Sequence, residues 1–128
     1  MPGDTGGTLI TLPASADLSA SQFCAVAVDS AGRVIVANGS SSPAGLIIGI
    51  LQNKPTAIDR PAVVQVNGRS KVKAGAALAT IGAKISSGSA GTAVAYTTTD
   101  CLIGILLTAA GADGDIVDCI LQPGIFID

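Results

Sequence analysis

The chain has 128 residues, which is enough for one domain with a substantial core but too few for two full-sized domains. Hydrophobic residues make up 48% of the sequence and charged residues only 12%, against roughly 25% charged residues in an ordinary domain. So few charges predict that part of the surface is covered in an oligomer or a larger assembly. A small monomer with a surface rich in Ser, Thr and Gly is the alternative. The net charge of -2 argues against a nucleic-acid-binding protein, which usually carries a basic excess.

Cysteine spacing and the N-terminal segment indicate the compartment. Cys24, Cys101 and Cys119 are odd in number and lack a CxxC spacing, so neither a disulfide framework nor a zinc site is predicted. All three lie in apolar stretches, which predicts buried, reduced thiols. Met1–Ala16 has no basic residue and no long apolar run, so we expect no secretory signal. No apolar stretch approaches the roughly 18 residues of a membrane helix, and we expect assembly in a cytoplasm with no membrane partner.

The pattern of short strands predicts the fold class. Apolar stretches rich in Val and Ile recur between clusters of Gly, Asn, Asp and Ser at intervals of about ten residues, which is typical of short antiparallel strands. We therefore predict an all-β fold, a compact barrel or sandwich. The predicted strands are Thr8–Leu12, Cys24–Val28, Val34–Ala37, Gly45–Leu51, Ala62–Val66, Arg69–Val72, Leu78–Ile81, Ala93–Tyr96, Leu102–Leu107 and Asp115–Leu121.

The first segment is predicted to be an extended N-terminal arm, residues 1–12, ahead of a single β domain, residues 13–128. Its Gly-rich start is followed by a strand-forming run that could add to the sheet of a neighbouring molecule. We therefore take this run as a candidate segment for binding a partner in a larger assembly. Its residues are Thr8, Leu9, Ile10, Thr11 and Leu12.

Turns separate the next predicted strands. Asp17 could cap a single helical turn that packs Leu18 and Phe23 inward. Asp29–Gly32 and Asn67-Gly68 each supply a residue able to take positive φ between two strand-like runs, which predicts two hairpins.

A basic stripe is predicted on the following strand. Arg69, Lys71 and Lys73 alternate with Ser70 and Val72, so the three cations project from one face of a strand. They could contact an acidic partner surface. The alternative is an edge strand whose charges protect it against aggregation.

Two halves of the sequence show a weak internal repeat. Ser30–Ala37 resembles Ser89–Tyr96, and Leu46–Leu51 resembles Cys101–Leu106 at a similar spacing. A duplicated β-unit whose sheets bury each other's apolar faces would produce this pattern. Convergent use of Gly and Val in a β-protein is the alternative.

Catalytic and cofactor-binding motifs are scarce. The chain contains no His and no Glu, which removes the commonest general base and the commonest zinc ligand. It has no phosphate-binding glycine loop and no nucleophile elbow, so we predict a non-enzymatic protein without a cofactor or metal. Asp113, Asp115 and Asp118 superficially resemble a calcium loop without its terminal Glu, and an Asp-Gly turn is the preferred interpretation.

The order of several short motifs resembles the capsid cement, or head decoration, proteins of tailed bacteriophages, over nearly the whole chain. The motifs are Ala14–Ser19, Phe23, Ala25–Val36, Ile48–Gln52, Val64–Gly68, Val72–Ala77 and Ile103–Leu106. The resemblance implies a β-rich structural protein on the outer surface of the capsid that bridges major capsid subunits. It also implies a homo-oligomer, with a trimer favoured. It supplies no binding motif that could be transferred residue by residue.

Two other functions stay open at this point. A carbohydrate-binding or fibre-like virion module that recognises a host surface is the first, although only Phe23, Tyr96 and Phe126 could offer aromatic platforms. A small barrel enzyme that uses Cys or Asp is the second, and the absence of His disfavours it.

Overall fold

The computed structural model describes residues 8–37, 47–88, 90–96 and 101–125, with the backbone only at residues 101 and 122–125. Within these ranges it consists of strands and connecting turns, without a helix, which confirms the all-β prediction. The strands are β1 (Leu9–Pro13), β2 (Ala25–Val28), β3 (Val34–Val36), β4 (Gly49–Leu51), β5 (Pro61–Gln65), β6 (Gly68–Lys73), β7 (Lys84–Ser87), β8 (Ala93–Ala95), β9 (Cys101–Leu106) and β10 (Ile116–Ile125).

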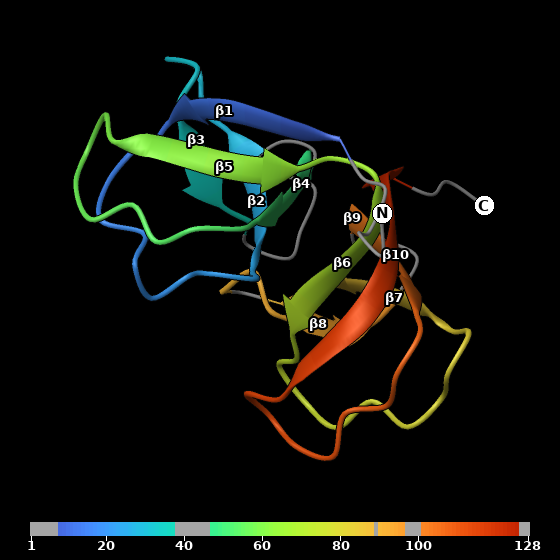
Figure 1. Ribbon diagram of the computed structural model, residues 1–128. Helices are drawn as coiled ribbons and strands as arrows, with labels where there is room; N and C mark the ends of the chain where they lie inside the picture. The colour runs from blue at the N-terminus through green and yellow to red at the C-terminus, as the bar shows by residue number, and fades with distance from the viewer. Residues whose placement is uncertain (1–7, 38–46, 89, 97–100, 126–128) are drawn as a thin grey trace, which may run out of the picture.

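The ten strands form two five-stranded antiparallel sheets with the same topology. The first sheet has the order β1-β5-β4-β2-β3 and the second has the order β6-β10-β9-β7-β8. Each strand of the first sheet therefore has a counterpart five strands later in the second. We call β1–β5 the N-terminal repeat and β6–β10 the C-terminal repeat. Figure 1 shows them as an upper layer in blue to green and a lower layer in yellow-green to red.

Matching hydrogen bonds confirm the internal duplication residue by residue. The β2–β3 turn is closed by N–H donation from Asp29 to Arg33, and the β7–β8 turn by donation from Gly88 to Thr92. Isolated parallel bridges join Ala14 to Val34 in one repeat and Ala74 to Ala93 in the other. The similarity between the two halves of the sequence thus reflects one structural unit used twice.

Each repeat curves around an equivalent set of apolar side chains. The N-terminal repeat buries seven residues, Ala14, Leu18, Val26, Val34, Leu51, Ala62 and Val64, in a cluster of its own. Their counterparts in the C-terminal repeat, by register and matched hydrogen bonds, are Ala74, Leu78, Ile85, Ala93, Leu106, Val117 and Cys119, which all belong to the larger cluster. Aliphatic side chains fill both cores, as the low aromatic content requires.

The larger cluster also holds the two sheets together as a sandwich. Ala25 and Ile50 of the N-terminal repeat pack into the core of the C-terminal repeat. Hydrogen bonds reinforce this contact: Ser70 accepts one from the Gln52 amide at 3.0 Å, and the Lys73 N–H donates to the Phe23 carbonyl at 2.8 Å. Of the predicted barrel or sandwich, the structure is the sandwich.

The prediction of a strand at Leu78–Ile81 is wrong. Leu78 makes only an isolated bridge to Ala110, and the chain then turns through Gly82, whose φ is 89°. The strand lies later, at β7, where Ser86 and Ser87 are both buried. Serines are poor strand signals in a sequence, so this strand was missed.

The Asn67-Gly68 turn does not form a hairpin. Gly68 has the predicted positive φ, at 82°, but β5 and β6 belong to different sheets. The turn is therefore the crossover between the two repeats. The β2–β3 hairpin at Asp29–Gly32 is confirmed, with φ of 81° at Gly32.

The predicted helical turn near Asp17 is replaced by hydrogen-bonded turns without a helix. Its capping contact nevertheless exists, because the Asp17 carboxylate accepts hydrogen bonds from the backbone N–H and the hydroxyl of Ser19. Leu18 is buried and Phe23 is partly buried, so both apolar side chains pack inward as predicted.

Candidate interaction surface

Strand β6 forms one edge of the second sheet and carries the predicted basic stripe. Arg69 and Lys71 are exposed and Lys73 is partly exposed, whereas Ser70 and Val72 are buried. The alternation predicted from the sequence is therefore confirmed. The edge position agrees with the protective interpretation as well as with a binding interpretation.

Isoleucines on the neighbouring strand β10 extend this basic stripe into a mixed face. Lys73 pairs with Ile116, Lys71 with Asp118 and Arg69 with Ile120. Directly paired residues in an antiparallel ladder project from the same face. Ile116 and Ile120 are 46% and 39% exposed, although large aliphatic side chains gain from burial. We call the surface made by these six residues the basic face.

The charges on the basic face are only partly neutralised. Arg69 forms an ion pair with Asp118, with 2.6 Å between the nitrogen and the carboxylate oxygen. The Lys71 ammonium lies 6.0 Å from the centre of the Phe23 ring. Lys73 donates a hydrogen bond to the Ala20 carbonyl at 3.4 Å. With three cations and one carboxylate, the face suits an acidic partner surface.

A hollow of about 400 Å³ borders the basic face. Lys54 and Lys73 both line it, and Phe23 and Ile116 contribute apolar surface. No carboxylate is among the described residues that line it. Two lysines beside apolar surface suit a carboxylate side chain presented by a partner.

The other predicted binding segment lies on the corresponding edge of the first sheet. Leu9–Pro13 forms β1 and pairs with β5 of the same chain, so this strand needs no neighbouring sheet in order to form. Thr8 donates its N–H to the Asn67 side chain at 2.8 Å, which brings the start of β1 next to the start of β6. Leu9 is 57% exposed. Residues 1–7 of the predicted arm lie outside the described residues.

The two thiols that the structure describes are buried. Burial raises the pKa of the Cys119 thiol to about 12, with a further contribution from the charge of Asp118. Burial also raises the pKa of Cys24, against the opposing charge of Lys73. Both thiols are therefore protonated at neutral pH and are poor nucleophiles. The side chain of Cys101 lies outside the described residues.

Two aspartates of the apparent calcium loop, Asp115 and Asp118, have structural partners. The Asp115 carboxylate accepts hydrogen bonds from the backbone N–H groups of Gly111 and Ala112, and Asp118 pairs with Arg69. Gly114 has a φ of 95°, as an Asp-Gly turn requires. The turn interpretation thus accounts for these residues.

Sequence reasoning missed the apolar members of the basic face, Ile116 and Ile120. A signal for both was present. The run Ile116-Val117-Asp118-Cys119-Ile120-Leu121 is apolar at nearly every position, whereas a strand with one face in water alternates apolar and polar residues. An excess of apolar residues on such a strand predicts that apolar side chains lie on both of its faces.

A solved structure from a bacteriophage matches almost the whole fold. The crystal structure of the head fiber gp8.5 N base in bacteriophage phi29 superposes with a TM-score of 0.61, covering 94% of this chain and 98% of that chain. The two chains share one fold. Their sequences are only 17% identical, so the likeness is one of architecture. No protein-family model and no curated protein matches the chain.

The likeness includes both repeats, because a match over 94% of the chain cannot be confined to one five-stranded sheet. The head fiber base is therefore similar to this chain in its duplicated β-sandwich as a whole. No helix long and apolar enough to cross a membrane occurs in the part of the chain that the structure describes.

Proposed function

We propose that this protein is a non-enzymatic virion protein that attaches to the outer surface of a phage capsid and stabilises it by bridging major capsid subunits. The observation that carries the proposal is the shared fold with a phage head fiber base over nearly the full length of both chains. The order of sequence motifs that resembles capsid cement proteins supports it independently. Homo-oligomers, with a trimer favoured, are part of the same proposal.

The basic face offers the physical means of attachment. Arg69, Lys71 and Lys73 provide charge that steers the protein toward an acidic surface, and Ile116 and Ile120 provide apolar area that gains from burial. The exposed strand β1 provides a second edge, through residues Thr8–Leu12. Several modest contacts of this kind, repeated over many copies, give a strong combined attachment.

A co-sedimentation experiment tests this proposal. Purified protein is added to mature capsids of the source phage that were assembled without it, and the capsids are then pelleted and heated. We expect saturable binding and a higher temperature of capsid disruption. Absence of the protein from the pellet contradicts attachment, and binding without stabilisation contradicts the cement role.

A head fiber base is the second candidate, favoured by the same fold likeness. In this role the domain anchors a fibre that recognises a host surface, and it need not stabilise the capsid. Binding that leaves the disruption temperature unchanged, together with retention of a separate fibre protein, supports this candidate. Glycan-array binding by the isolated domain supports direct recognition of carbohydrate.

A further inference from the structure

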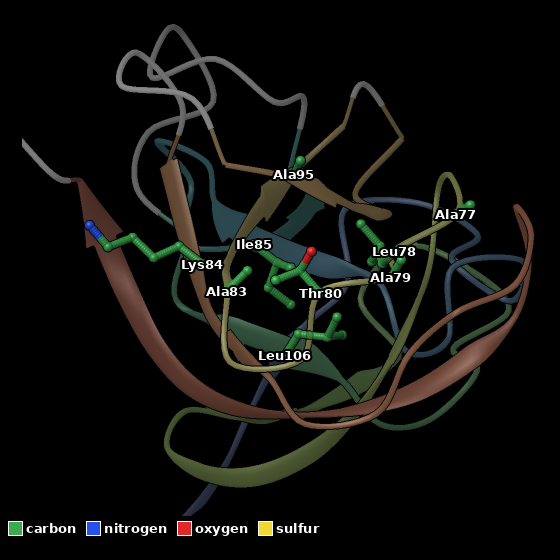
Figure 2. Close-up of a pocket in the computed structure, with 9 residues that line it drawn as sticks. All are labelled: Ala77, Leu78, Ala79, Thr80, Ala83, Lys84, Ile85, Ala95 and Leu106. Atoms are coloured by element: carbon green, nitrogen blue, oxygen red, sulfur yellow. The ribbon is translucent and has the colours of Figure 1, made fainter.

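The C-terminal repeat has an open groove, whereas the equivalent position in the N-terminal repeat is covered. The groove has a volume of about 230 Å³ and is lined mainly by apolar residues, among them Ala83, Ile85, Ala95 and Leu106. Figure 2 shows Thr80, Ile85 and Leu106 facing a common space, while the Lys84 side chain extends away from it.

In the N-terminal repeat, the position equivalent to this groove is covered by the β7–β8 hairpin of the C-terminal repeat. Gly91, at the tip of the β7–β8 hairpin, accepts a hydrogen bond from the Ala25 N–H at 2.7 Å. A Cβ atom placed on Gly91 would lie 2.8 Å from Val36 Cγ1 and 3.1 Å from Cys24 Cβ. The hairpin tip therefore touches Cys24, Ala25 and Val36 at close range.

Those three contact residues correspond one for one to residues of the open groove. Leu51 donates its N–H to the Cys24 carbonyl, as Leu106 does to Ala83. Likewise, the Ala37 N–H donates to the Ala25 carbonyl, and the Tyr96 N–H donates to the Lys84 carbonyl. Val26 pairs with Val36 across the β2–β3 hairpin, as Ile85 pairs with Ala95 across the β7–β8 hairpin. The third counterpart, Ala95 for Val36, follows from this matching register.

The hairpin of the N-terminal repeat makes no such contact with the described residues of its own chain. Gly32 corresponds to Gly91, since each donates its N–H to the first residue of its turn, Asp29 or Gly88. A Cβ atom placed on Gly32 meets no atom within 4 Å. Ser30, Ala31 and Gly32 are all exposed. In the part of the chain that the structure describes, one hairpin and one groove of the same design are therefore both left uncovered.

We propose that the groove beside Ala83 and Ala95 binds the Asp29–Gly32 hairpin of a second copy of this chain. The contact repeats between copies the docking that Gly91 makes within one copy. It joins two different surfaces, so it is head-to-tail, and it closes into a ring if the rotation allows. In a trimer, hairpin contacts within a chain then alternate with hairpin contacts between chains. The inference rests on the oligomeric part of the proposed function and not on capsid attachment.

Light scattering of the purified protein without capsids tests this contact. Ala31→Arg blocks the hairpin and Ala95→Arg blocks the groove, and both positions are exposed, so the fold should be retained. We expect the unmodified chain to form oligomers at micromolar concentration and each variant to be monomeric. Ala95→Val introduces the residue found at the equivalent position, Val36, and should keep the oligomer. Ala112→Arg, an exposed change in another loop, is the matched control and should also keep it.

Mixing the two arginine variants gives the decisive result. Ala31→Arg retains an intact groove and Ala95→Arg retains an intact hairpin, so the equimolar mixture should form a dimer of the two and stop there. A mixture that stays monomeric contradicts a head-to-tail contact. An unmodified chain that is monomeric, arginine variants that remain oligomeric, or a control that dissociates equally would also overturn the proposal. Because no capsid is present, failure of this contact is separate from failure of attachment.

Discussion

Phe23 in the N-terminal repeat occupies the backbone position that Gly82 occupies in the C-terminal repeat. Both residues have positive φ, 66° and 89°, and both donate their N–H to equivalent leucines, Leu51 and Leu106. Left-handed φ costs a residue with a side chain about 1–2 kcal/mol. The Phe23 ring packs against the central core beside Lys71, so the duplicated unit keeps a strained residue where its ring borders the basic face.

Two substitutions separate this strain from the packing of the ring. Phe23→Gly and Phe23→Ala both remove the ring, but only glycine relieves the positive φ. We expect the glycine variant to be more stable by about 1 kcal/mol in urea unfolding, a reversal of the usual preference for Ala over Gly. Equal stability, or a more stable alanine variant, contradicts strain at this position.

A matched pair of glycines tests the contact between the repeats. Gly32 and Gly91 have nearly the same φ, 81° and 79°, so Ala costs the same strain at both. At Gly91 the new Cβ would also lie 2.7 Å from the Ala25 carbonyl oxygen. We therefore expect Gly91→Ala to destabilise the fold by about 1–3 kcal/mol more than Gly32→Ala. Both are measured by thermal or urea unfolding in the Ala95→Arg background, which keeps copies apart, and equal losses would argue against close docking.

Much of the fold could be predicted from the sequence because aliphatic strands and glycine turns alternate regularly. The duplication was visible at Ser30–Ala37 and Ser89–Tyr96, where the two copies kept similar residues. Leu18 and Leu78 lie outside these similar segments, yet both are buried before an equivalent turn. Their equivalence indicates a turn after Leu78 in place of a strand.

The candidate surface was predictable only in part. Alternating charges identify one face of β6, because side chains in a strand alternate regardless of the partner. That Ile116 and Ile120 lie beside them depends on the pairing of β10 with β6, strands separated by more than forty residues of chain. The crossover at Asn67-Gly68 shows the same limit, since a turn sequence sets local φ but not which strands pair.

Charge on the basic face should control attachment in a salt-dependent way. Replacing Arg69, Lys71 and Lys73 with Ser should lower capsid occupancy mainly at low salt, where screening is weak. Arg60→Ser, an exposed cation in another part of the molecule, is the control and should leave occupancy unchanged. If the triple variant binds as well as the parent at both low and high salt, the cations only protect the edge of β6.

Apolar contact on the same face should respond differently. Replacing Ile116 and Ile120 with Ser removes exposed apolar area, and we expect lower occupancy at low and high salt alike. The free energy of unfolding should fall only modestly, because both side chains are partly exposed and neither belongs to the two core clusters. Ile58→Ser removes another exposed isoleucine, outside the basic face, and serves as the control. Full occupancy by the double variant would leave the isoleucines without a role in attachment.

The thiol of Cys119 should resist modification in the folded protein. Its pKa of about 12 keeps it protonated at pH 8, and its side chain is fully buried. We expect labelling of Cys119 to require unfolding, and stability to fall as pH rises from about 9 toward 12, since the unfolded thiol ionises first. Mass spectrometry of native protein treated with iodoacetamide checks this, and rapid native labelling at Cys119 contradicts the burial.

A cryo-electron map of the source phage head tests the central claim most directly. The account predicts density for the two-sheet domain on the outside of the capsid, with β6 and β10 turned toward acidic side chains of the major capsid protein. A head without such density contradicts attachment. Density in which Arg69, Lys71 and Lys73 face solvent contradicts the assignment of the basic face.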